Sequence, residues 1–226
     1  MKLLSTSAKL EKSQTDEWLN VVMYLEPDAD KSICLGASEG CRETCIKRTG
    51  MMAMQQQSAA RLKRTMFYLQ SPEEFKAQLI AELQSKLKSA KRAGKRLAAR
   101  LNGTSDIDWS DIYLLFPEIQ FYEYTKRANL AKQLQDIPNL HLTLSRHEKH
   151  KPERIRMLTG QGINVAVVFN AAADNLPAEY LGIPVINGDK HDRRFEDKQG
   201  VIVGLSLKGS KAVKQKAINS GFAVTC

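Results

Sequence analysis

Long apolar segments are absent from this sequence. No apolar run approaches the roughly 20 residues that a membrane-spanning helix needs, and residues 1–12 contain no apolar core of signal-peptide length. On these grounds we expect a soluble, cytoplasmic protein with no membrane partner. Low-complexity segments and fixed-period repeats are absent as well.

Cysteine is scarce and unevenly placed. Four cysteines in 226 residues are too few for a disulfide scaffold. Three of them, Cys34, Cys41 and Cys45, fall close together, whereas Cys226 ends the chain. In a reducing compartment such bunching indicates metal ligation more than disulfide bridges.

The composition is typical of a folded globular protein. Hydrophobic residues make up 42% of the chain and charged residues 26%, which is too apolar for a disordered chain and too evenly mixed for a fibre. A chain of this length can bury one substantial core, so we expect a single α/β domain over residues 1–226 with an N-terminal arm at 1–17. The formal charge of +9 favours polyanionic partners such as nucleic acid, without identifying one.

Short strand-like runs alternate with helical patterns along the chain. Residues 19–25 predict the first strand, and a cysteine-bearing loop at 26–50 turns into a helix near Glu39. A helix over 51–69 follows, and a second helix begins at Pro72 and ends at Gly94. Further strands are expected at 97–102, 119–124, 140–145, 163–169, 183–187 and 201–206, and further helices at 108–116, 127–134 and 151–158.

Repeated β/α units over residues 97–222 imply a parallel sheet. About seven strands with right-handed crossovers would close or nearly close a sheet into a barrel. We therefore expect an α/β fold built as a partial or distorted parallel (β/α) barrel. The alternative is an open, doubly wound parallel sheet.

Polar residues crowd the predicted carboxyl ends of the strands, the edge where α/β folds build their sites. The loops on the opposite edge are plainer in composition. We expect the polar edge to surround a substrate or cofactor cavity. The candidate cofactor-binding residues are Asn102, Ser105, Asp106, Tyr124, Lys126, Ser145, Arg146, Asn187 and Asp189.

The spacing C-x6-C-x3-C predicts a shared metal site. If a helix begins near Glu39, Cys41 and Cys45 lie one turn apart on one face, and Cys34 reaches them from the preceding loop. Thiolates are soft ligands that suit iron-sulfur clusters and zinc. The paired short spacings of a structural zinc site are absent, so we expect a [4Fe-4S] cluster with one open iron. The alternatives are zinc, with Cys226 or a histidine as fourth ligand, and three reduced cysteines that simply pack.

Two further groups of residues are candidates. One could supply a second metal site or an acid-base pair, although a solvated polar rim explains it equally well; it comprises His147, Glu148, His150, His191 and Asp192. The other is a basic stretch at the end of the second helix, which fits either phosphate contacts with nucleic acid or a solvated helix end; it comprises Lys86, Lys88, Lys91, Arg92, Lys95 and Arg96.

Seven blocks of the sequence resemble, in order, a phage and plasmid family named after mycobacteriophage gene product eighty-eight. The match spans most of residues 18–222, and the family implies no settled activity. The blocks are CLGASEGCRETC, RLNGTSDIDW, FYEYTK, LTLSRHE, NVAVVF, VINGDKHDRRF and GVIVGLSLKG.

The placement of the cysteines directly after the first strand is similar to that of radical S-adenosylmethionine enzymes, whose partial β/α barrel carries a three-cysteine loop there. That resemblance implies a [4Fe-4S] cluster whose open iron binds S-adenosylmethionine, with the turn at residues 102–106 near the amino group of that cofactor. The chain departs from the family in its cysteine spacing, in Thr44 before Cys45 where the family has an aromatic residue, and in lacking a paired glycine and glutamate in the turn.

Three functions follow as hypotheses. The leading one is an iron-sulfur protein of phage or plasmid type, acting as a radical S-adenosylmethionine-like enzyme on an anionic or nucleic-acid-related substrate. The second is a nucleic-acid-binding regulator whose cysteine loop is folded by metal. The third is a protein that binds a host factor.

Overall fold

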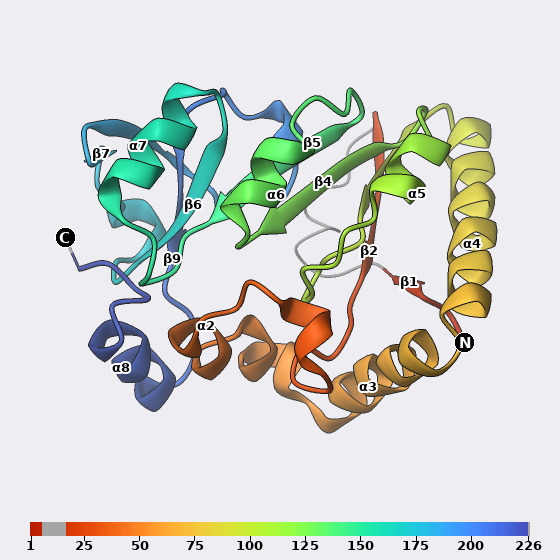
Figure 1. The fold of residues 1–226 in the computed structure, drawn as a ribbon, viewed down its shortest axis with the longest axis horizontal. Coiled ribbons are helices and arrows are strands. Elements are labelled where there is room, and N and C mark those ends of the chain that lie inside the picture. The colour runs from red at the N-terminus through yellow and green to blue at the C-terminus, as the bar shows by residue number, and fades with distance from the viewer. Residues whose placement is uncertain (6–16, 226) are drawn as a thin grey trace. The chain divides into compact units, whose positions relative to one another are not determined.

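The computed structural model describes residues 1–5 and 17–225 (Figure 1). Most of the expected N-terminal arm and Cys226 therefore lie outside the described residues. The strands are β1 (Leu4–Ser5), β2 (Trp18–Met23), β3 (Arg96–Arg100), β4 (Gln120–Thr125), β5 (Leu140–Ser145), β6 (Asn164–Phe169), β7 (Glu179–Tyr180), β8 (Ile183–Asn187) and β9 (Ile202–Ser206). The helices are α2 (Glu39–Glu43), α3 (Gln55–Gln70), α4 (Pro72–Arg92), α5 (Ser110–Leu115), α6 (Ala128–Gln133), α7 (Pro152–Gly160) and α8 (Lys211–Asn219).

Short 3₁₀ helices complete the described elements, namely η1 (Lys31–Cys34), η2 (Ile46–Arg48), η3 (Gly50–Ala53), η4 (Ala173–Asn175) and η5 (Arg194–Glu196). None of the helices in the described ranges is both long and apolar enough to cross a membrane. The expected strands and helices are found within a few residues of their predicted positions. Sequence reasoning missed β1, β7 and α8.

A nine-stranded, mostly parallel sheet runs through the described chain in the order β1-β2-β3-β4-β5-β6-β9-β8-β7. The first and last pairs, β1 with β2 and β7 with β8, are antiparallel. The pairs β2–β3, β3–β4, β5–β6, β6–β9 and β8–β9 are parallel. The predicted α/β class is thus confirmed, while closure into a barrel stays a prediction.

The chain forms two compact units. The first comprises residues 1–35, 55–123 and 136–141, and the second comprises residues 36–54, 124–135 and 142–226. Strands β4 and β5 contribute residues to both units. We describe each unit by itself.

The first unit packs α3 and α4 with strands β1 to β3 (Figure 1). Apolar residues recur every four positions along one face of α4, and Phe75, Leu79 and Leu83 on this face are fully inaccessible. Phe75 also stacks on Trp109, with ring centroids 6.2 Å apart. Gly94, at φ +66°, ends α4 as expected, because a left-handed residue there is cheap only for glycine.

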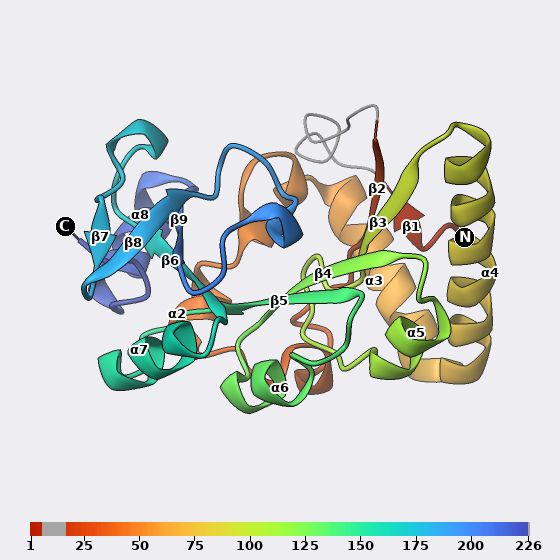
Figure 2. The same ribbon diagram turned by 90° about the horizontal axis from the view of Figure 1, so that it is seen from above.

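The second unit is built on β6, β9 and β8, which run side by side (Figure 2). Gly204 lies at the centre of β9, opposite Val167 of β6 and Asn187 of β8. A Cβ atom at Gly204 would come within 2.7 Å of Val185 Cγ1, so the close packing of this layer requires glycine.

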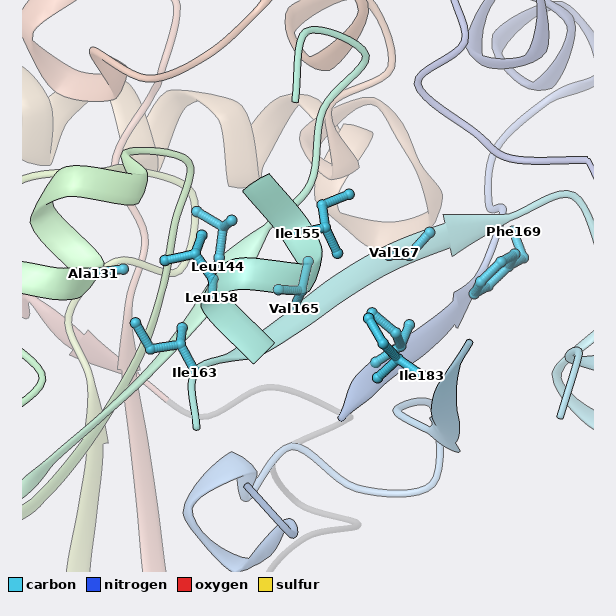
Figure 3. Packing of buried hydrophobic residues seen from close by; sticks show 10 residues of the cluster. Ala131, Leu144, Ile155, Leu158, Ile163, Val165, Val167, Phe169 and Ile183 are labelled. Atoms are coloured by element: carbon cyan, nitrogen blue, oxygen red, sulfur yellow. The ribbon is translucent and has the colours of Figure 1, made fainter. Parts of the chain in front are cut away.

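One face of these strands holds an apolar cluster with α7 (Figure 3). Branched aliphatic side chains from the strands interlock with the buried face of the helix, and this burial is the main stabilisation of the unit. The members are Ala131, Leu144, Ile155, Leu158, Ile163, Val165, Val167, Phe169, Ile183 and Ile202.

Candidate functional site at the carboxyl ends of the strands

In the first unit, the turn that follows β3 is a self-contained hydrogen-bonded structure. The Oδ1 atom of Asn102 accepts from Ser105 Oγ at 2.8 Å and from the Ile107 amide at 3.0 Å, and its Nδ2 donates to the Ile107 carbonyl at 2.9 Å. Asn102, Ser105 and Asp106 are all buried. The described polar contacts of Asn102 and Ser105 thus hold the turn together.

The same turn holds the chain segment that leads to Cys34. The Gly103 amide donates to the Met23 carbonyl at 2.9 Å, and Thr104 Oγ1 donates to the Leu25 carbonyl at 2.5 Å. The Asp106 amide donates to the carbonyl of Ile33, which is fully buried. A Cβ atom at Gly103 would lie 2.5 Å from the Tyr24 ring, so this glycine permits the close approach of the turn to the end of β2.

Glu123, which sequence reasoning missed, supports this turn from β4. Its carboxylate accepts from the Leu101 amide at 2.5 Å and from the Asn102 amide at 2.9 Å. Residues 101 and 102 therefore leave the expected strand, because a carboxylate rather than a neighbouring strand satisfies their amides. Burial raises the pKa of Glu123 to about 7, since the opposing effect of the two amides and of the Arg100 charge is smaller.

In the second unit, the ends of β4 and β5 bring together Lys126, Ser145, Arg146 and Glu148, which we call the strand-end cluster. Lys126 Nζ donates to Ser145 Oγ at 2.8 Å and lies 5.2 Å from the centre of the Phe222 ring. Arg146 Nη1 donates to the carbonyls of Gly221 at 2.7 Å and Phe222 at 2.9 Å. Three predicted site residues thus converge, and all three contact the segment after α8 or one another.

Glu148 binds the amino end of the cysteine-bearing helix α2. It accepts from Ser38 Oγ at 2.7 Å and from the Gly40 amide at 3.2 Å. Burial alone would raise the pKa of Glu148, but these hydrogen bonds outweigh it and the pKa is lowered. A Cβ atom at Gly40 would meet both Ser220 Oγ at 2.9 Å and Glu148 Oε2 at 3.0 Å, so glycine is required where the helix meets the carboxylate.

The three clustered cysteines are half-buried thiols. Cys34 ends η1 in the first unit, whereas Cys41 and Cys45 belong to the second. Helix α2 begins at Glu39 as predicted, but it ends before Cys45, because the backbone leaves the helical region at Thr44 (φ −110°, ψ 15°) and is extended at Cys45 (ψ 137°). Cys41 packs against the apolar cluster beneath α8, formed by Leu207, Ala217, Phe222 and Ala223.

Thiolate donors fit the chemistry of an iron-sulfur cluster or zinc. Their arrangement is a different matter: across residues 1–5 and 17–225, no three histidine, cysteine, aspartate or glutamate side chains gather as a ready-made ligand set. A metal at these cysteines would therefore have to draw its ligands together.

A separate network joins the ends of β8 and β9. Asp189 accepts from the Ser206 amide at 2.8 Å, from Ser206 Oγ at 2.5 Å and from Lys208 Nζ at 2.5 Å. Asn187 Oδ1 accepts from the Asp189 amide at 2.9 Å, while its Nδ2 donates to the Ala173 carbonyl at 2.8 Å. Burial would raise the pKa of Asp189, but the bonds from Lys208 and Ser206 lower it.

The remaining candidates fall into two places within the second unit. His147 stacks on His150, with ring centroids 3.8 Å apart. His191 instead contacts Arg194, which is fully buried and forms an ion pair with Asp197 at 3.2 Å. Tyr124 lies half-buried on β4. Asp192 is buried in the loop beside Arg194.

These features define a mostly parallel α/β protein whose strand-end side chains hold a short cysteine-bearing helix. The chain belongs to the Gene product 88 family, whose model matches residues 1–226, and the predicted family resemblance is confirmed. No curated protein and no solved structure matches the chain. The similarity to radical S-adenosylmethionine enzymes stays a prediction.

The buried carboxyl of Glu123 predicts a pH dependence of stability. Because the folded pKa of about 7 lies above the ordinary value of 4.5, the native state holds this proton more tightly. The contribution is fully present below pH 4.5 and is lost as the pH rises through 7, by about 3 kcal/mol at most. Urea unfolding measured at several pH values between 4.5 and 8 should show that the free energy of unfolding of the wild type falls as the pH rises. The free energy of unfolding of Glu123→Gln should lack this fall, whether or not the variant is less stable overall.

Glu118→Gln is the matched control for that experiment, because Glu118 is exposed. It should keep the wild-type slope. If Glu123→Gln kept the wild-type slope, folding would not raise the pKa of this carboxyl.

Because Glu148 hydrogen-bonds the amino end of α2, we expect this end of the helix to open more often when the carboxylate is removed. Hydrogen bonds to a charged group contribute about 1.5 to 3 kcal/mol, so Glu148→Ala should speed amide exchange at Gly40 and Cys41 by roughly tenfold or more. Alkylation of the Cys41 thiol should accelerate too. Glu153→Ala, at an exposed position of α7, serves as control, and equal rates in the two variants would refute the anchoring role.

Proposed function

We propose that the protein binds a metal centre, by preference a [4Fe-4S] cluster, through Cys34, Cys41 and Cys45. The observation that carries the proposal is three half-buried thiols within one short segment. Both ends of that segment are held by strand-end residues. The turn at residues 102–106 hydrogen-bonds the Ile33 carbonyl, immediately before Cys34. Glu148 hydrogen-bonds the amino end of α2, the helix that carries Cys41.

The finer form of the proposal is a radical S-adenosylmethionine-like enzyme on a partial β/α barrel. Its support is the order of elements, in which a cysteine segment directly follows a strand that pairs in parallel with β3. A bound cluster would supply one-electron reduction. This chain's own residues would hold the cluster loop, and Asn187, Asp189 and Lys126 are the proposed contacts for the cofactor or an anionic substrate.

Protein purified without exposure to air should contain iron and sulfide and absorb visible light. Alanine at any one of positions 34, 41 and 45 should remove the iron, whereas Cys226→Ala should retain it. If the wild-type protein and Cys226→Ala are colourless and contain stoichiometric zinc, and each of the three variants at positions 34, 41 and 45 lacks it, the metal is zinc and not an iron-sulfur cluster.

Metal-free protein separates ligation from packing. If the cysteines only pack, no metal is found, and Cys41→Ala lowers the free energy of unfolding of the metal-free protein, because Cys41 contacts the cluster beneath α8. That result would overturn the proposal. Reductive cleavage of S-adenosylmethionine by reconstituted protein tests the enzymatic form separately, and its absence under strong reduction would leave only the metal centre.

A second candidate is binding to nucleic acid through the basic end of α4. Lys88, Lys91 and Arg92 are exposed there, but part of the charge is offset: Lys91 pairs with Glu118 at 2.6 Å, and nearby Arg96 pairs with Glu17 at 3.2 Å. A host-factor-binding role has no specific support in these contacts.

If this surface binds DNA or RNA, neutralising Lys88 and Arg92 to glutamine should reduce the slope of log affinity against log salt by about 2, one for each lost phosphate contact. Neutralising Lys211 and Lys214, exposed on α8, changes the net charge equally and is the control. Equal losses in both variants would mean diffuse attraction, and no binding at low salt would end this candidate.

A further inference from the structure

A cavity of about 540 Å³ opens in the second unit between α6 and the amino end of α7. Its volume lies in the range of small-molecule sites. No aspartate or glutamate lines it. The lining residues are Arg127, Ala128, Asn129, Leu130, Gln133, His150 and Arg154.

The positive charge of Arg154 is not neutralised by a carboxylate within the described ranges. Its Nη2 donates to Asn129 Oδ1 at 2.6 Å, and that partner is an uncharged amide. Arg127, the residue that immediately precedes α6, brings a second guanidinium to the same cavity. Two planar forks facing one space are suited to an anion with several oxygens.

His150 adds a neutral donor. Its Nδ1 accepts from the His147 amide at 3.3 Å, which places the ring proton of the neutral imidazole on Nε2. Burial, followed by the charges of His147, Lys126, Arg146 and Arg154, lowers the pKa of His150 to about 4. Lys126, Arg146 and Arg154 are positively charged at neutral pH, so the potential around the cavity is positive.

We propose that this cavity binds a phosphate monoester, with the phosphoryl group held by Arg127 and Arg154 and a hydrogen bond from His150. A dianion with three free oxygens matches two guanidinium forks and one N–H donor better than a carboxylate does. Buried Leu130, with Ala128, offers apolar surface for the organic part of the ligand. The site goes beyond the proposed metal centre and shares no ligand with it.

Calorimetric titration of the full chain with ribose 5-phosphate and, separately, with inorganic phosphate tests the site. We expect saturable binding of the monoester with one site per chain, and weaker binding of inorganic phosphate because it lacks the organic part. Arg127→Gln and Arg154→Gln should each weaken binding by roughly tenfold or more, as expected for loss of a charged hydrogen-bond donor.

Arg156→Gln is the matched control, because Arg156 is exposed on α7 and its Nε contacts only the Leu181 carbonyl among the described partners. Its affinity should stay at the wild-type value. In the wild type, the ring resonances of His150 should shift as the monoester is added, a readout that needs no variant to fold.

Absence of saturable binding at millimolar monoester would overturn the proposal. Equal weakening by Arg156→Gln and Arg154→Gln would also overturn it, since that result indicates diffuse attraction to a basic surface. Either failure leaves the metal-centre proposal intact, because the cysteines take no part in this measurement.

Discussion

The structure depends on satisfying buried backbone polar groups where the strands end. Once β3 ends, the amides of Leu101 and Asn102 have no neighbouring strand to bond, and an orphaned buried amide costs about 1 to 3 kcal/mol. The Glu123 carboxylate accepts from both. Arg146 does the same for acceptors, because its guanidinium donates to the carbonyls of Gly221 and Phe222.

This constraint gives the strand-end residues a structural role before any chemical one. Polar residues at the carboxyl edge of a parallel sheet ordinarily indicate a ligand site. Here the side chains of Asn102, Lys126 and Arg146 each donate a hydrogen bond to another group of the protein. A ligand that displaced them would have to replace those bonds. In the cavity beside α7, by contrast, the described hydrogen bond of the Arg154 side chain goes to an uncharged amide oxygen, so the positive charge of Arg154 is available to an anion.

In the cysteine segment, the local sequence decides the ligand chemistry, whereas the structure decides the length of the helix and the packing of the thiols. Soft-ligand chemistry follows from the residue types alone. The length of α2 does not, because the backbone turns out of the helical region at Thr44 and Cys45 is extended. Cys41 packs under α8, a helix that sequence reasoning missed although Ser210 supplies a readable amino-terminal cap.

The amino-acid sequence by itself determined the class of fold, the positions of the central strands and the buried stripe of α4, because strand and helix periodicity are local properties of the chain. It also carried the family relationship. Only the tertiary structure decided which polar groups meet. Glu148 bonds Ser38 from 110 positions along the chain, and Arg146 bonds Gly221 from 75. No local pattern encodes such partners, because these half-buried charged groups bond whatever lies near them in space, however far away it is in the sequence.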